Sequence, residues 1–215
     1  MNSIPDWNRI KPWLKRINPS LMLAPLAPVL FVITANAFTW DALLSKHLHE
    51  TAAIILVGIA LLIFAIRTRL HHGPIYPLLL FLTASLLFRE IHLPYTGDAI
   101  YICLAITLIW GYRARAQLAP QLQIGPLYPW LTATLFTYFI SQAIARRFFR
   151  IIPGEDLLHV PLEETTETAA HILLIITSCI GAWSVWQSKE SDQKPSAHER
   201  QKSGSPYASM DTDSK

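Results

Sequence analysis

The segment with the greatest capacity for chemistry opens the last apolar run of the chain. It reads Glu163-Glu164-Thr165-Thr166-Glu167-Thr168-Ala169-Ala170-His171. On an α-helix, which turns by ~100° per residue, Glu164, Glu167 and His171 fall within a ~60° arc. Because a charge that faces lipid is costly, such groups usually face the protein interior, a partner or water. The spacing therefore predicts a carboxylate–imidazole site at the mouth of a membrane helix.

Other titratable residues are predicted to lie at the same end of the helices. The remaining acids between positions 41 and 167 all fall at the outer ends of predicted spans or in outer loops, and they are Asp41, Glu50, Glu90, Asp98, Glu155, Asp156 and Glu163. The same end holds His47, His49, His92 and His159. Four or five spans contribute to this gathering, which is the strongest indication of function in the sequence.

A metal site is the first interpretation of this gathering. Carboxylates and imidazoles from several helices of a bundle are the ligands that iron, manganese and zinc use. The candidate ligands are His47, Glu50, Glu90, His92, Glu164, Glu167 and His171. A divalent ion bound there would activate water, and the protein would then hydrolyse or oxidise a lipid-like substrate at the outer leaflet. The residues leave open whether it is an enzyme.

A network of charges without metal is the alternative interpretation. Its basic members would be Arg89, Arg146, Arg147 and Arg150, which can pair with the buried carboxylates or bind an anionic lipid headgroup or small solute. The protein would then be a transporter, a sensor or a structural component. Two further interpretations are ordinary solvated loops and a haem held by two of His47, His92 and His171, which the surrounding acids disfavour.

The composition places the chain in a membrane. Hydrophobic residues make up 52% of the sequence and charged residues only 15%, a balance that is typical of a polytopic membrane protein and excludes an ordinary soluble domain. The net charge is only +3, and we expect the lipid bilayer and no nucleic acid as a partner. The cysteines, Cys103 and Cys179, lie in separate apolar runs without a CxxC motif, which excludes a disulfide framework.

The predicted fold is all-α, a bundle of six transmembrane helices, because a backbone in lipid must satisfy its own polar groups. The predicted spans cover residues 21–40, 50–66, 75–88, 98–112, 127–145 and 163–186. A polar loop rich in Gln and Pro precedes the fifth span, and a short acidic loop at 151–162 precedes the sixth. We expect an amphipathic interfacial helix in residues 1–18, the membrane domain in 19–188, and a disordered tail in 189–215.

Six spans put both termini on one side of the membrane. The positive-inside rule makes that side the cytoplasm, where the inner loops carry Arg67, Arg69, Arg113 and Arg115. The candidate site would then face the periplasm. Arg146, Arg147 and Arg150 depart from the rule. A signal peptide cleaved after Ala35-Asn36-Ala37 is an alternative interpretation of the first span.

Two short motifs carry a resemblance. Phe88-Arg89-Glu90-Ile91-His92, together with Glu163-Glu164-Thr165-Thr166-Glu167, resembles a pattern in uncharacterised multi-pass proteins of the bacterial inner membrane. The resemblance implies that location and no established activity. Alkaline ceramidase-like hydrolases also place histidines and acids at span ends, but their HxxxH pair is absent here. The sequence contains no GxGxxG, Walker, GxSxG or HExxH motif, since Ala53 stands where HExxH needs its second histidine.

Overall fold

The computed structural model describes residues 15–71, 73–91, 96–123, 126–148, 150 and 155–192. Within these ranges it contains helices and no strand, which confirms the all-α prediction. The chain divides into two compact units, residues 1–182 and 183–215. The contacts described below all lie within the first unit.

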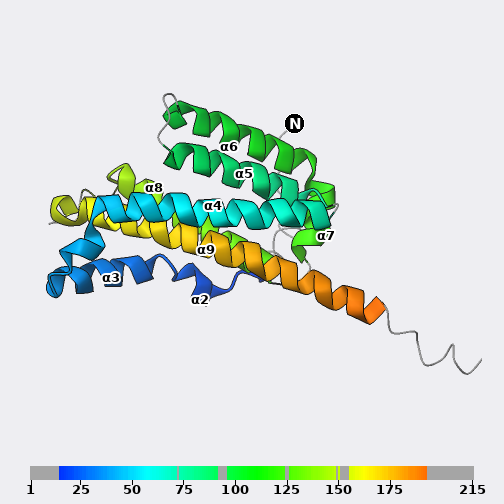
Figure 1. The fold of residues 1–215 in the computed structure, drawn as a ribbon, viewed down its shortest axis with the longest axis horizontal. Coiled ribbons are helices and arrows are strands. Elements are labelled where there is room, and N and C mark those ends of the chain that lie inside the picture. Colours follow the sequence, from blue (N-terminus) through cyan, green and yellow to red (C-terminus); the bar gives the residue numbers. More distant parts are fainter. Residues whose placement is uncertain are drawn as a thin grey trace, which may run out of the picture. The chain divides into compact units, whose positions relative to one another are not determined.

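The first unit is a set of helices joined by short connections (Figure 1). In chain order the helices are α2 (Pro19–Met22), α3 (Leu26–Ala37), the 3₁₀ helix η1 (Asp41–Leu44), α4 (Lys46–Leu70), α5 (Ile75–Glu90), α6 (Thr96–Arg113), α7 (Arg115–Gln123), α8 (Leu127–Ala145) and α9 (Glu155–Asp192). Helix α5 lies beside both α4 and α6 (Figure 1). The long α9 continues into the second unit.

The helix bounds follow the predicted spans closely for the second to the fifth span. Helix α8 matches the predicted span at 127–145, and α4, at 25 residues, is longer than predicted at both ends. The first apolar run is divided, because turns at 23–25 separate α2 from the 12-residue α3. The structure describes little of the predicted interfacial helix at 1–18 and nothing of residues 193–215.

Two loop predictions were wrong. The Gln- and Pro-rich segment forms α7 despite Pro120, because Leu118 is buried against the core that Phe64 and Tyr76 help to form. Residues 155–162, predicted as loop, form the start of α9 with Pro161 inside the helix. There the buried His159 ring bonds the Ile144 carbonyl through Nε2 at 3.0 Å. Packing has overridden local propensity in both places.

Among the described residues, one helix is long and apolar enough to cross a bilayer alone. It is α4, whose best window has a mean hydropathy of 2.3. A second span is possible if Ala99–Arg113 and Arg115–Leu122, which meet at an 85° bend, form one broken span. The six-span arrangement therefore stays a prediction.

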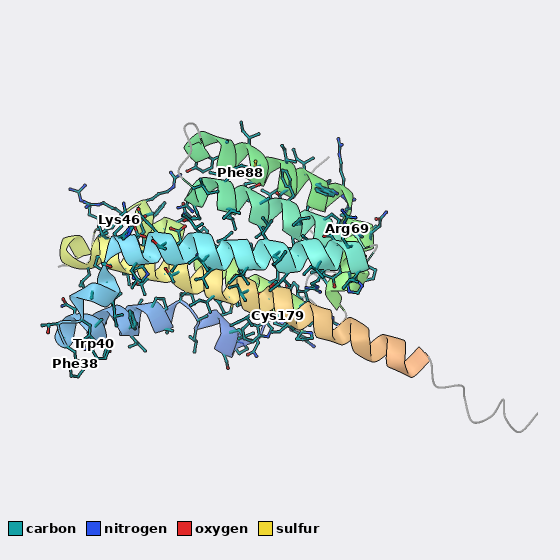
Figure 2. The ribbon with its side chains drawn as sticks, viewed as in Figure 1. Phe38, Trp40, Lys46, Arg69, Phe88 and Cys179 are labelled. Carbon is teal, nitrogen blue, oxygen red and sulfur yellow. The ribbon has the colours of Figure 1, made fainter. Side chains whose placement is uncertain are left out.

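Polar side chains are common inside the first unit. Fully buried side chains include Thr83, Thr137 and Thr166, and each hydroxyl donates to the carbonyl four residues earlier in its own helix at 2.6–2.9 Å. Such a bond satisfies the hydroxyl without a partner on another helix. The outside, in contrast, carries large apolar side chains such as Phe38 and Phe88, 64% and 58% exposed (Figure 2).

Candidate functional site

Three of the predicted ligands meet at one end of the helices. Glu90 is the last residue of α5, and Glu167 and His171 lie one turn apart on α9. One potential ligand atom from each side chain lies within 4.8 Å of the other two. His171 Nε2 is 3.9 Å from Glu90 Oε1. We call Glu90, Glu167 and His171 the triad.

The triad is shielded from solvent. His171 is 0% exposed, Glu90 8% and Glu167 9%. Neither ring nitrogen of His171 has a hydrogen-bond partner in the part of the chain that the structure describes. Buried ring nitrogens are nearly always bonded to protein, to water or to an ion, so these two are available to a water molecule or an ion.

Arg89 forms the rim of the triad. Its Nη1 donates to Glu167 Oε1 at 2.6 Å, and its side chain is 29% exposed. Burial alone lowers the pKa of this guanidinium, but the carboxylates of Glu167 and Glu90 outweigh that effect and hold the pKa above its ordinary value. The rim is therefore a permanent positive charge that lies just after the predicted third span.

Helix α8 contributes a third wall. The Tyr138 ring meets the His171 ring edge to face, with 5.5 Å between centroids and 74° between planes. The hydroxyl oxygens of Tyr138 and Ser141 and the amide nitrogen of Gln142 are buried without a hydrogen-bond partner among the described residues. Tyr138 also lies within electrostatic range of Glu167, Glu90 and Arg89. The sequence interpretation missed Tyr138; the available signal was Tyr138 and Gln142 one turn apart inside an apolar run.

Three other predicted ligands lie outside the triad. Glu50 pairs with Lys46 at 3.5 Å on the side of α4, where both side chains are partly exposed. His47 is exposed on the same helix, so it does not share a buried site with His171. Glu164 is half-buried on α9 within electrostatic range of Lys46 and Glu50. His92 lies outside the described residues.

The predicted basic partners divide in the same way. Arg89 contacts the triad, whereas Arg146 donates to the Tyr101 hydroxyl on α6 and lies over its ring. Arg147 and Arg150 are exposed after the end of α8. Thus one of the four arginines borders the triad in the described contacts.

His49 joins three helical segments near the triad. Its ring is buried, with Nδ1 2.9 Å from the Thr168 hydroxyl on α9 and Nε2 3.0 Å from the Leu43 carbonyl in η1. Both ring nitrogens are therefore engaged. His49 holds α4 against the turn of α9 that carries Glu167, which makes it a structural residue.

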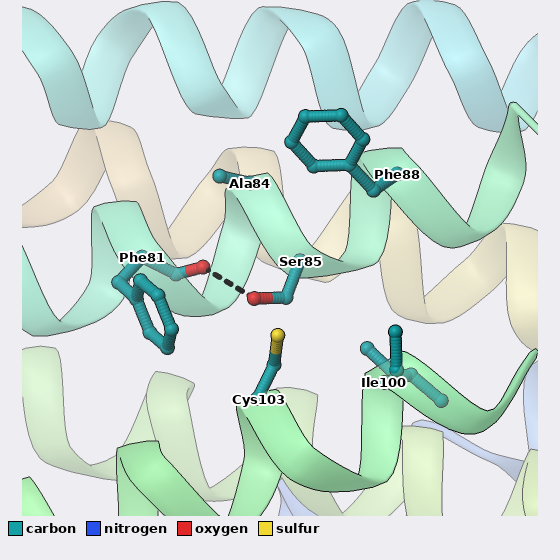
Figure 3. Close-up of a pocket in the computed structure, with 7 residues that line it drawn as sticks. Phe81, Ala84, Ser85, Phe88, Ile100 and Cys103 are labelled. Carbon is teal, nitrogen blue, oxygen red and sulfur yellow. Dashed lines mark hydrogen bonds between the residues drawn. The ribbon is translucent and has the colours of Figure 1, made fainter. Parts of the chain in front are cut away.

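An apolar pocket lies between α5 and α6 (Figure 3). It has a volume of about 390 Å³ and is lined by Phe81, Ala84, Ser85, Phe88, Ala99, Ile100 and Cys103. The Ser85 hydroxyl donates to the Phe81 carbonyl at 2.8 Å and is thus satisfied. Phe88 and Glu90 are ~200° apart around α5, so the pocket opens on the side of the helix away from the triad.

Comparison with known proteins adds no relative to this description. No protein-family profile, no curated protein and no solved structure matches the chain.

Proposed function

We propose that the chain is a multi-span α-helical protein of the bacterial inner membrane in which Glu90, Glu167 and His171 bind a divalent iron, manganese or zinc ion. The observation that carries this proposal is the buried triad, with ligand atoms within 4.8 Å of one another and a His171 ring that has no hydrogen-bond partner among the described residues.

The side chains of the triad suit such an ion. Two carboxylates and an imidazole form a mixed oxygen and nitrogen set of the kind that these metals accept, and bound ligand atoms need to approach to about 2.0–2.2 Å from zinc. A carboxylate has two oxygens, so Glu167 can hold Arg89 with one and an ion with the other. Three protein ligands leave a coordination position for water, as catalytic zinc sites do.

The distribution of polarity supports the membrane part of the proposal. The fully buried side chains include Arg67, His171, Thr134 and Thr177, whereas Leu108 is 65% exposed. A polar interior beneath an apolar surface suits a protein whose surroundings are lipid. If the protein is integral, it stays in the membrane fraction after alkaline carbonate washing; release into the supernatant would contradict the proposal.

The surroundings favour a lipid-like substrate with a polar or anionic head. Such a molecule would present its head to Arg89, at the rim, while its chains remain in the bilayer. The ion would supply an activated water, and the Tyr138 ring packs edge to face on His171 with its hydroxyl oxygen buried and without a hydrogen-bond partner among the described residues. The periplasmic side is assigned to the site by the positive-inside rule alone.

Metal analysis of the purified protein tests the proposal. The protein is expressed without a histidine tag, purified in detergent and analysed for iron, manganese and zinc. Near-stoichiometric metal is expected in the wild type, and it should be lost in Glu167→Gln and His171→Ala. The matched controls are Glu50→Gln and His47→Ala, whose side chains lie outside the triad and should leave the metal content unchanged. Absence of metal from the wild type after supplementation would overturn the metal site.

The Arg89–Glu167 pair favours a second candidate function. At 2.6 Å it is a direct ion pair, so the triad can also act as a charge network that binds an anionic headgroup or solute without metal. In that case the metal-free protein is the native form. Arg89→Gln and Glu167→Gln should then couple by roughly 0.5–3 kcal/mol in a double-mutant cycle, and added metal should not change that coupling.

A further inference from the structure

A second polar feature lies at the other end of α4, around Arg67. This residue is one turn before Leu70, the last residue of the helix, and it is 1% exposed. It is among the largest fully buried side chains of the described residues. An arginine buried inside a membrane helix is costly and most often marks a binding or functional site.

Two contacts fix the orientation of the guanidinium. Nη1 donates to the Ser178 carbonyl on α9 at 2.8 Å. Its central carbon lies over the Tyr76 ring of α5, 4.0 Å from the ring centroid. Three helices, α4, α5 and α9, therefore hold the guanidinium in place. A ligand that binds it would lose little free energy to ordering the side chain.

One edge of the guanidinium has no hydrogen-bond acceptor in the part of the chain that the structure describes. Nε and Nη2 are both buried, and neither has an acceptor within hydrogen-bond geometry among the described residues, although the Tyr76 side chain lies within electrostatic range of the guanidinium. These two nitrogens point the same way, and together they form the edge with which arginine makes two parallel hydrogen bonds to an oxyanion. A buried charge whose hydrogen-bond donors are only partly paired is costly.

The adjacent chain segments supply no counter-ion. Residues 67–74 and 113–126 contain no aspartate or glutamate, and they add Arg69, Arg113 and Arg115. The acids between positions 41 and 167 are those counted at the opposite end of the predicted spans. The other acids of the sequence lie near its two ends, and they are Asp6, Glu190, Asp192, Glu199, Asp211 and Asp213. Apart from these terminal acids, a negative charge for Arg67 must come from a ligand.

We propose that the Nε–Nη2 edge of Arg67 binds a phosphate group, carried by a phospholipid headgroup or by a free phosphate. Phosphate presents two oxygens at the spacing that this edge matches, and the basic inner turns favour a doubly charged anion. The site is separate from the triad and does not depend on the metal. Because protein covers the edge, the ligand enters only when the helices separate, so exchange is slow and the ligand survives purification.

Bound phosphorus is the first measurement. Wild-type protein, Arg67→Gln and Arg69→Gln are purified in detergent and phosphate-free buffer, and native mass spectrometry records what stays bound. Arg69 is the matched control, since it lies two residues away on the exposed side of α4. One phosphate-bearing molecule per chain is expected in the wild type and in Arg69→Gln, and none in Arg67→Gln. A lipid mass identifies a headgroup, and a mass gain of free phosphate identifies the ion.

A second variant guards against misfolding. Arg67→Lys keeps the charge but cannot donate two parallel hydrogen bonds. We therefore expect it to fold and to bind phosphate at least about tenfold more weakly than the wild type does. The melting temperature of the delipidated wild type should also rise when its natural ligand is added. The two ligands to test are inorganic phosphate and vesicles that contain phosphatidylglycerol. The proposal is overturned if neither ligand raises the melting temperature, or if Arg67→Lys binds as the wild type does.

Discussion

The Arg89–Glu167 pair gives the sharpest stability prediction. In Arg89→Gln the positive charge is removed, while the Glu167 carboxylate remains, with its side chain only 11% exposed. Glu90, which is also buried, keeps a second negative charge nearby. The metal-free variant therefore holds carboxylates that lack their main compensating charge.

The size of the effect follows from burial. Removing one partner of a buried ion pair costs about 3–5 kcal/mol, because the other charge remains without compensation. An exposed pair contributes about 0–1 kcal/mol. Lys46–Glu50, at 3.5 Å and with side chains 62% and 36% exposed, is an exposed pair among the described residues. We therefore expect a loss of about 3–5 kcal/mol in Arg89→Gln and at most about 1 kcal/mol in Lys46→Gln.

Thermal unfolding in detergent, followed by circular dichroism, measures both variants. In a chain of this size 1 kcal/mol shifts the melting temperature by about 2–4 °C, so Arg89→Gln should melt roughly 6–20 °C lower after chelation of metal. Added metal should restore part of the loss, since a bound cation supplies positive charge to the same carboxylates. Equal shifts in Arg89→Gln and Lys46→Gln would refute the reasoning from burial.

Two further predictions concern the packing inside the first unit. Thr134→Val leaves the Thr177 hydroxyl, 2.9 Å away in the wild type, without its partner and should cost about 1–3 kcal/mol, whereas the double variant Thr134→Val/Thr177→Val should recover most of that loss in chemical unfolding. Phe64→Ala opens a cavity at a fully buried position and should lower the free energy of unfolding by about 3–5 kcal/mol in the same assay. The matched control is Ile66→Ala, at a side chain that is 50% exposed, and it should lose far less stability in detergent. Similar losses in the two variants would contradict the packing described here.

Helix periodicity predicted the part of the site that lies on one helix. Glu167 and His171 are four residues apart on an apolar run, and this spacing is sufficient to place them on one face of α9. The arrival of Glu90 beside them depended on the direction of α5 and on where that helix ends. The sequence predicted that acids collect at one end of the spans, which places Glu90 near Glu167 and His171. The same prediction included Glu50, which the structure places outside the triad.

The separation of Glu50 from Glu90 depends on rotation about the helix axis, which the sequence determines weakly here. Helix α4 is apolar on most sides, so no pattern distinguishes the face that bears Glu50 from the face that bears His49. Packing turns His49 inward to Thr168 and leaves Glu50 beside Lys46. Tyr138 was missed for a related reason, since a tyrosine within an apolar run has the composition of ordinary core.

The hydroxyls that bond within their own helices also affect how the helices can move. Thr137 and Thr166 bond carbonyls of their own helices, so they fill the interior without joining one helix to another. Thr134–Thr177 is a direct hydroxyl link between α8 and α9 among the described residues. Sliding α9 along α8 by an ångström or so would break few directional bonds, and such shear of packed helices is a common way for proteins to open and close. Directional links between helices also lie at His159, which bonds the Ile144 carbonyl of α8, and at His49, the triad and Arg67. Because the triad and Arg67 join α9 to α5 and α4, ligands bound at either place would restrain α9 against those two helices.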